Sequence, residues 1–267
     1  MIRLVLTVVA LLATATIGEA QHSIPDPRVA DLVQAGSIRV GLFLPQYTKD
    51  PATGELRGVW AEIARAFAAR VGIEAVLLAK PTPQEAVACL KASACDLLFL
   101  PLDGRAAEIG DFSQPIFQFD YTLLVPAGSP IRSVADADRP GVRVAAVRNH
   151  ASTLTLSGLL KQAELVYAET PKPTFELLQT GQADVMASTR NALLEFSGQL
   201  PGSRVLEDRF GANINRMVVP KNKTAWLAYV TEFVEDAKAS GLVQKAIDRA
   251  GPRGVTVAPP GDPQRAF

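Results

Sequence analysis

The sequence predicts an α/β protein with two lobes, and three observations lead to this expectation. Apolar strand-like runs alternate with helical patterns up to about residue 122, which is the βαβ rhythm of a mainly parallel sheet flanked by helices. The rhythm restarts beyond that point, over a stretch long enough for a second core. Two further helical patterns near the C-terminus pack most economically on the first lobe. The chain would then cross between the lobes twice, near 122–128 and 212–220, and two such crossings form a hinge over a cleft.

The expected domain organisation follows from this rhythm. We expect lobe 1 over residues 21–122 plus 218–257, lobe 2 over 123–217, and a flexible tail rich in Pro and Gly over 258–267. A chain of 267 residues with 48% apolar and 20% charged residues is ordinary for a globular protein with a full core. The formal net charge of zero gives no indication of a nucleic acid or an anionic membrane as a partner.

Residues 1–20 have the pattern of a secretory signal peptide. Arg3 precedes an apolar run from Leu4 to Ile17, and a small-x-small ending predicts cleavage after Ala20. A membrane anchor is the weaker alternative, because the apolar run is shorter than the ~20 residues that a span needs. We therefore expect a soluble protein that is exported to the periplasm.

The elements of the first lobe are defined by apolar runs and by glycine and proline. An apolar run predicts the first strand, and a hydrophilic, hairpin-like loop over 48–57 follows it. Gly58 precedes a helical pattern with Ile63 and Phe67 on one face, and Gly72 is typical of the position after a helix. The expected elements are a strand over 38–44, a helix over 59–71, a strand over 73–79, a helix over 83–93 and a strand over 96–100.

The second lobe repeats the alternation, with Gly181 ending one of its helices. Its expected strands cover 121–125, 142–147, 165–168 and 183–188, and its expected helices cover 152–162, 173–180 and 190–197. A last apolar strand over 217–219 is closed by Pro220. The two remaining helices are expected over 223–239, where Trp226 and Phe233 belong to one apolar stripe, and over 242–250 between two glycines.

Cys89 and Cys95 are the only cysteines in the chain. Export to an oxidising compartment favours a disulfide between them, across the short loop from a helix end to a strand start. Two free buried thiols are the alternative, because disulfide geometry is demanding. Two sulfurs with no nearby histidine make only half of a ligand set, so we expect no metal site. No motif indicates a cofactor.

Arg105 is the leading candidate for ligand binding. It follows a buried strand and the turn at Asp103 and Gly104, and Asp111-Phe112-Ser113 comes shortly after it. Ligands of open α/β sheets bind just beyond the carboxyl ends of the strands. An arginine placed there presents a fixed fork of donors that suits a carboxylate. The alternative is a solvated loop charge, which is the commonest environment of arginine.

Four segments carry a resemblance to a known family. Residues 58–64, GVWAEIA, are similar to a G-F-D-x-D-L-A motif, and Arg105 followed by DFSQP at 111–115 looks like T-x-x-R followed by D-F-S-x-P-Y. Residues 141–151 look like G-K-x-V-G-V-x-x-G-T-T, and 181–185 look like G-x-x-D-A. In order and spacing, these segments resemble the extracellular solute-binding proteins of family 3, the polar amino-acid type of ABC importers, which have the type II periplasmic binding fold.

The resemblance implies a function and a set of site residues. Such proteins clamp a small molecule between their lobes and deliver it to a membrane permease, so we expect a monomer that meets its permease transiently. Arg105 takes the place of the arginine that grips the ligand α-carboxylate. Asn149, His150 and Ala151 fall where the family has a Gly-Thr-Thr turn whose backbone N–H groups face the same carboxylate. Gln46 and Tyr47 lie where the family often has an aromatic cover for the ligand.

Two departures from the family pattern bear on the ligand. Thr189 stands where the family has the aspartate that pairs with the ligand α-ammonium, and Trp60 replaces the first aspartate of G-F-D-x-D. A buried ammonium group without a carboxylate partner is costly. We therefore hypothesise a ligand that keeps its carboxylate but need not carry an α-amino group. An aromatic or apolar small acid would suit Trp60 and Tyr47.

Several candidates also have an ordinary structural interpretation. His150 is either a hydrogen-bonded structural residue or a ligand contact. Trp60 and Tyr47 are either core residues or ligand contacts. Thr189 is either the N-cap of the helix that begins at Arg190 or a ligand contact.

Two other classes of function are weighed against the binding protein. Cyclohexadienyl dehydratases resemble this family, and Glu169, Glu176 or His150 would be candidates for a general acid. The sequence contains no G-x-S-x-G, no H-E-x-x-H, no phosphate loop and no metal-ligand cluster, so we expect no enzyme. A protein that presents its loaded form to a sensory receptor is the third possibility.

Overall fold

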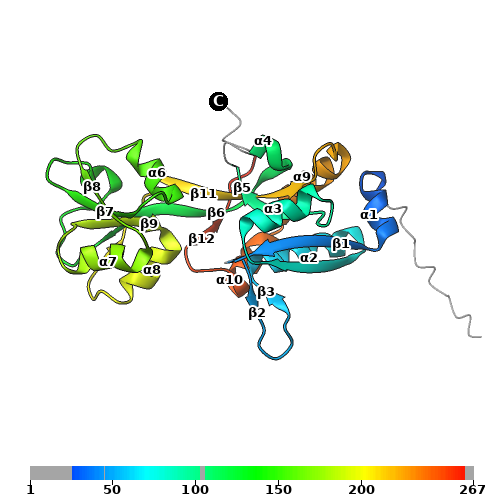
Figure 1. Ribbon diagram of the computed structural model, residues 1–267, viewed down its shortest axis with the longest axis horizontal. Coiled ribbons are helices and arrows are strands. Elements are labelled where there is room, and N and C mark those ends of the chain that lie inside the picture. Colours follow the sequence, from blue (N-terminus) through cyan, green and yellow to red (C-terminus); the bar gives the residue numbers. More distant parts are fainter. Residues whose placement is uncertain (1–25, 45, 103–105, 262–267) are drawn as a thin grey trace, which may run out of the picture.

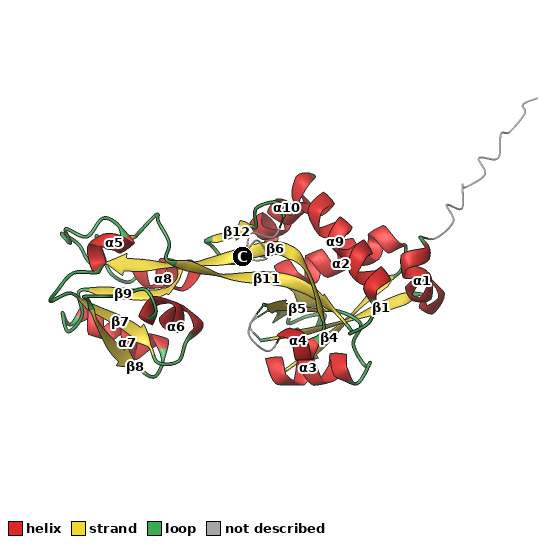
Figure 2. Cartoon of the chain, turned by 90° about the horizontal axis from the view of Figure 1, so that it is seen from above, coloured by secondary structure: helices red, strands yellow, loops and turns green. Residues whose placement is uncertain are grey.

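The computed structural model describes residues 26–44, 46–102 and 106–261. The molecule is elongated and consists of two bodies, joined by the long strands β6 (Asp111–Val125) and β11 (Gly211–Val219) (Figures 1 and 2). Strand β6 contributes to the hydrophobic core of both bodies, with Phe117 in the first and Leu123 in the second. The two cores are therefore separate, and the connecting strands are the continuous element between them.

The first body combines the N-terminal elements with the C-terminal helices. Strands β1 and β4 pair in parallel from Ser37↔Glu74 to Phe43↔Lys80. Helix α2 buries Ile63 and Phe67 against this sheet and against α9. Its elements are η1 (Pro27–Val29), α1 (Ala30–Ala35), β1 (Ser37–Phe43), β2 (Thr48–Lys49), β3 (Leu56–Arg57), α2 (Val59–Val71), β4 (Glu74–Lys80), α3 (Pro83–Lys91), β5 (Leu98–Pro101), α4 (Ala106–Ile109), α9 (Thr224–Ala239), α10 (Leu242–Ala250) and β12 (Val255–Val257).

The second body is a smaller α/β unit at the other end of the connecting strands. Strand β7 lies between β8 and β9, and both of these pairings are parallel. Strand β6 joins antiparallel to β9, from Tyr121↔Thr189 to Leu124↔Met186. Its elements are α5 (Val134–Ala137), β7 (Arg143–Val147), α6 (Ala151–Ser157), β8 (Glu164–Ala168), α7 (Pro171–Gln179), β9 (Val185–Thr189), α8 (Arg190–Ser197) and β10 (Arg204–Val205).

The connecting strands make the sheets mixed rather than mainly parallel. The strand order across the molecule is β5-β11-β6-β9-β7-β8, and β11 runs antiparallel to both β5 and β6. The sequence predicted only the ends of these strands, 121–125 and 217–219. Pairing with β6 along the whole of β11, and with β5 from Asn215 onward, overrides the low strand propensity of Gly and Asn in 211–216. Pro115 is tolerated in β6 because the pairing with β11 is irregular there.

Two further differences from the sequence-based expectation concern element ends. Helix α6 ends at Ser157 instead of continuing to Gln162, and Gly158 follows it. Strand β12 pairs antiparallel with β6, and the amide of Ala258 donates a hydrogen bond to the carbonyl oxygen of Ile116. Lys238 Nζ also donates a hydrogen bond to the carbonyl oxygen of Pro259 at 3.0 Å, so the described chain makes hydrogen bonds at residues 258 and 259, and the flexibility predicted for 258–267 stays a prediction.

A disulfide joins Cys89, near the end of α3, to Cys95, before β5. The two Cα atoms are 5.2 Å apart, and both side chains belong to a buried cluster. Of the two alternatives that the sequence left open, the structure therefore contains the bridge. The bridge fixes the end of α3, a helix that contributes side chains to a cavity.

None of the helices in the described part of the chain is both long enough and apolar enough to cross a membrane.

Candidate functional site

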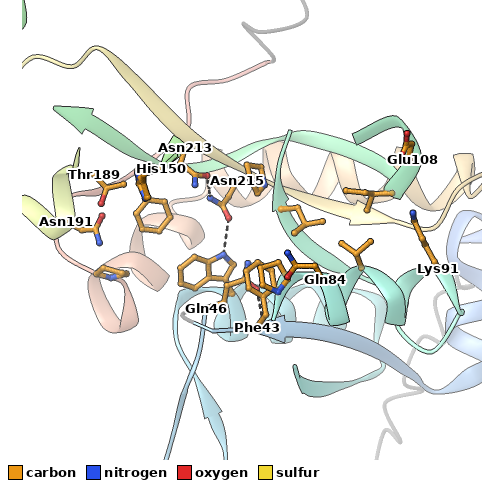
Figure 3. A pocket seen from close by; sticks show the side chains of 18 of the residues that line it. Phe43, Gln46, Gln84, Lys91, Glu108, His150, Thr189, Asn191, Asn213 and Asn215 are labelled. Atoms are coloured by element: carbon orange, nitrogen blue, oxygen red, sulfur yellow. Dashed lines mark hydrogen bonds between the residues drawn. The ribbon is translucent and has the colours of Figure 1, made fainter. Parts of the chain in front are cut away.

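A cavity of about 760 Å³ receives side chains from both bodies and from the connecting strands (Figure 3). The first body contributes mainly apolar and amide side chains from β1, α2 and α3. The second body contributes residues at the beginning of α6 and α8, and β11 contributes two asparagines. The polar and titratable lining residues are Gln46, Gln84, Lys91, Glu108, His150, Thr189, Asn191, Glu195, Asn213 and Asn215.

His150 is the N-cap residue of α6, and it presents its ring to the cavity. Its Nδ1 accepts a hydrogen bond from the backbone amide of Ser152 at 3.3 Å and lies 2.8 Å from the Ser152 hydroxyl oxygen. A backbone amide can only donate, so Nδ1 carries no proton and the neutral ring has its proton on Nε2. His150 therefore offers an N–H donor to a ligand.

The protein around the cavity lowers the pKa of His150. The cause is desolvation, because the surrounding walls remove part of the hydration of the charged ring although the ring stays accessible from the cavity. The direction agrees with the hydrogen bond at Nδ1, which a second ring proton would break. His150 is therefore neutral at neutral pH.

Trp60 lies in the first turn of α2 and lines the cavity. Gly58 precedes it at φ 134°, and a side chain at this glycine would lie 2.9 Å from the carbonyl oxygen of Gln46. This close approach brings the start of α2 against the end of β1. The indole ring stacks on Phe119 with centroids 5.8 Å apart and meets the edge of Phe117 at 5.4 Å.

A chain of hydrogen bonds leads from Trp60 to the connecting strand. The indole Nε1 donates to Asn215 Oδ1 at 3.2 Å, and Asn215 Nδ2 donates to Asn213 Oδ1 at 3.1 Å. Both asparagines come from β11 at alternate positions, so their side chains lie on the same face. Trp60 thus belongs to the core and also lines the cavity, and its predicted contact with a ligand stays a prediction.

Gln46 lines the cavity, but its amide is occupied by the protein. Its Nε2 donates to the carbonyl oxygen of Phe99 at 2.7 Å, and its Oε1 accepts from the amide of Phe43 at 3.3 Å. The side chain is 4% exposed. Gln46 therefore links the end of β1 to β5 and supports the cavity wall.

The beginning of α8 supplies a second polar group of residues. Thr189 occupies the N-cap position, yet its side chain makes no capping hydrogen bond. Asn191 Oδ1 is buried and has no partner among the described residues. Glu195 lies four residues further along the same helix face and also lines the cavity. This corner of the cavity therefore combines the Thr189 hydroxyl with the exposed Glu195 carboxylate, whereas the Asn191 oxygen is enclosed by the protein.

The structure brings together some of the predicted site residues and not others. Gln46, Trp60, His150 and Thr189 line the same cavity. Tyr47 is half-buried against the core of the first body, and neither it nor the exposed pair Asn149 and Ala151 contributes to the described lining. Asn149 has φ 59°, so it makes the turn that places His150 at the cavity.

Arg105 lies outside the described residues, and its predicted role in carboxylate binding stays a prediction. Its neighbours in sequence do reach the cavity, since Pro101 and Glu108 both line it.

Four further lining residues were not predicted from the sequence, namely Asn191, Glu195, Asn213 and Asn215. Asn191 and Glu195 carry a helical i, i+4 signal, but such spacing is common on solvated helix faces. The alternation of Asn213 and Asn215 is a strand signal, which becomes visible only when β11 is recognised over its whole length. Among the described residues, no group of His, Cys, Asp or Glu side chains is arranged to hold a metal ion.

Comparisons with known proteins agree with this architecture. The glutamine-binding protein of an ABC transporter from Bacillus subtilis is 26% identical to this chain over 204 residues, which are 72% of each protein. The solute receptor for L-cysteine of Neisseria gonorrhoeae superposes with a TM-score of 0.58 at 20% identity, over 86% of this chain and 99% of that one. An ancestral cyclohexadienyl dehydratase superposes with a TM-score of 0.61 at 24% identity, over 86% and 98% of the two chains.

The two structural likenesses confirm the type II periplasmic binding fold that the sequence resemblance implied. The sequence model of the bacterial extracellular solute-binding proteins, family 3, matches residues 40–251, and the chain belongs to this family.

Proposed function

We propose that this protein is the periplasmic substrate-binding component of an ABC importer and that it clamps a small carboxylate-bearing solute between its two bodies. The observation that carries the proposal is the shared cavity, because Trp60 and His150 come from different bodies and line the same space. A ligand that touches both bodies stabilises their approach, since it binds the closed arrangement better than the open one. The cavity volume of about 760 Å³ is within the usual range for small-molecule sites.

The chemistry of the lining supports a carboxylate with or without an α-amino group. His150 offers a neutral N–H donor, which suits a carboxylate oxygen. Thr189 presents a neutral hydroxyl at the corner where the family has an aspartate for the α-ammonium group, and the neutral residue Asn191 lines the cavity beside it. Glu195, four residues after Asn191, is the carboxylate of α8 that lines the cavity, and it is exposed. An α-amine is therefore tolerated by this lining and not required by it.

Binding is a better interpretation of this cavity than turnover. Glu169 pairs with Arg148 at 2.8 Å, and neither Glu169 nor Glu176 contributes to the described lining of the cavity. His150 has a lowered pKa, which makes it a poor general acid at neutral pH. The three residues considered for a dehydratase are thus either outside the described lining of the cavity or unprotonated.

A thermal-shift screen tests the proposal. The panel contains L-glutamine, L-cysteine and L-lysine together with amine-free acids such as glutarate, benzoate and phenylpyruvate. A compound that binds only the folded protein raises its melting temperature. We expect carboxylates, including at least one without an amine, to raise it, and we expect no turnover of prephenate. A panel in which only amino acids act would remove the amine-free part of the proposal, and a panel without any response would remove the carboxylate itself.

A further inference from the structure

The hydrogen bonds between Trp60, Asn215 and Asn213 determine the positions of the oxygen and the nitrogen in each asparagine amide (Figure 3). Amide oxygen and nitrogen are nearly indistinguishable by shape, so the orientation of an asparagine is normally inferred from its partners. The indole N–H of Trp60 can only donate. The Asn215 atom that it contacts must therefore be the oxygen, and the nitrogen of Asn215 faces Asn213.

The same reasoning fixes the orientation of Asn213, which lines the cavity. Because Asn215 presents its nitrogen, the Asn213 atom at 3.1 Å must be the oxygen. The Nδ2 group of Asn213 is then left at the cavity wall, and no described residue accepts a hydrogen bond from it. Because the indole N–H of Trp60 can only donate, the series of hydrogen bonds leaves Asn213 with a donor group at the cavity.

The residues that make these hydrogen bonds are held in place by their neighbours. Trp60 is 6% exposed and packs against Phe119 and Phe117, and Asn215 is 4% exposed. Asn215 lies where β11 is paired with both β5 and β6, opposite Pro101 and Phe117. A polar group whose orientation is set by buried neighbours is preorganised for recognition.

We propose that Asn213 is a specificity-determining residue, which donates a hydrogen bond from Nδ2 to an acceptor oxygen of the ligand, and that Trp60 and Asn215 are the positioning residues that keep it in the donor orientation. The proposal rests on the proposed function, because the ligand is the one held in the same cavity. It adds a neutral donor on the connecting strand, which selects for a carboxylate, carbonyl or hydroxyl oxygen and against a cationic group at this point.

The first test needs no knowledge of the natural ligand. Side-chain amide signals of Asn213 are identified by their loss from the NMR spectrum of the Asn213→Asp variant. The unliganded protein is then titrated with acetate, which carries only acceptors, and with methylammonium, which carries only donors. We expect acetate to shift the Asn213 signals and methylammonium to leave them unchanged. Equal shifts from both probes, or no shift from acetate, would overturn the proposal.

The second test separates positioning from general stability. Trp60→Phe removes the indole N–H but keeps an aromatic ring against Phe119. Trp226→Phe is its matched control, because Trp226 is 8% exposed and also donates from Nε1, to Asp31 at 2.6 Å, outside the described cavity lining. We expect Trp60→Phe to weaken the acetate-induced shift of the Asn213 signals and Trp226→Phe to preserve it. Equal acetate-induced shifts of the Asn213 signals in the two variants would contradict the positioning role of Trp60.

The third test distinguishes this inference from the proposed function. A carboxylate that raises the melting temperature of the wild type should bind Asn213→Asp on the order of tenfold more weakly, because a donor is replaced by a like charge. If such a compound binds both proteins equally, Asn213 has no part in specificity although the binding function stands. If no panel compound binds but acetate still shifts the Asn213 signals selectively, the donor stands and the carboxylate-import function falls. Should Trp60→Phe fail to fold, the wild type and Asn213→Asp decide the outcome.

Discussion

His150 combines a cavity position with a fixed tautomer, and this makes its titration a sensitive report on the site. Its ring nitrogen Nδ1 is held by Ser152, and partial desolvation of the accessible ring by the surrounding walls lowers its pKa below the ordinary value of 6.5. The unfolded chain therefore takes up the proton first as the pH falls. The contribution of His150 to stability is complete above the unfolded pKa and is lost between that value and the lower folded one.

We expect the ring signal of His150 in an NMR titration to have its midpoint below pH 6.5. The chain has two histidines, so the His150→Gln variant assigns the signal by its loss. The same variant should lose less unfolding free energy than the wild type when the pH falls from neutral to about 5, because it lacks the group that the unfolded state protonates. A midpoint at or above 6.5 would show that the walls of the cavity do not desolvate the ring.

At the scale of elements, the two bodies contain the same arginine–aspartate arrangement. In the first, Arg39 on β1 donates to Asp96 from its backbone amide at 2.8 Å and from its guanidinium at 2.9 and 2.7 Å. In the second, Arg143 on β7 makes the same three bonds to Asp184, at 2.8, 3.1 and 2.9 Å. Each aspartate precedes the neighbouring strand, so the arrangement fixes where adjacent strands begin.

The exposure of the two aspartates predicts unequal effects of their removal. Asp96→Asn should lower the free energy of unfolding by about 1–3 kcal/mol, because a bidentate, charge-assisted pair is lost at a side chain that is only 13% exposed. Asp184→Asn should lower the free energy of unfolding by less, because the Asp184 side chain is 39% exposed and the surrounding water screens the pair. Urea denaturation measures both.

Glu169→Gln is the control for this comparison. Glu169 also pairs with an arginine at 2.8 Å, but its side chain is 75% exposed. We expect no measurable change in stability for this variant. Equal losses in Asp96→Asn and Glu169→Gln would show that the three-bond arrangement adds nothing to an ordinary surface pair.

Elements with strong local signals were predictable from sequence, and elements defined by distant pairing were not. Helices α8 and α10 have the predicted bounds of 190–197 and 242–250, because each has a helical pattern that ends at a following glycine, Gly198 or Gly251. Strands β6 and β11 extend far beyond 121–125 and 217–219, because pairing between them compensates for Pro115 and for the asparagines of β11.

The resemblance to family motifs predicted the positions of some residues that line the cavity. The resemblance placed Trp60, His150, Gln46 and Thr189, and all four line the cavity. It gave no indication that Gln46 is held by backbone groups of β1 and β5, since that depends on two strands meeting at the same edge. Asn213 was missed for the related reason that its orientation is set by Trp60, which is more than a hundred residues away in the chain.

At the scale of the whole molecule, the relation between the bodies depends on β6 and β11. Each body has its own hydrophobic core, and the cavity lies where side chains from both meet. Such an arrangement allows the bodies to rotate about the connecting strands without disturbing either core. Asn213 and Asn215 lie on one of these strands, so a ligand that bonds to Asn213 contacts the connection as well as both bodies.

Ligand binding should therefore make the molecule more compact. We expect small-angle X-ray scattering to show a smaller radius of gyration when a compound that raises the melting temperature is added, because contacts with both bodies are completed only when they approach each other. A compound of similar size that leaves the melting temperature unchanged is the control and should leave the scattering unchanged. Tight binding with an unaltered radius of gyration would mean that the cavity accepts its ligand without closure, and the connecting strands would then be rigid supports rather than a hinge.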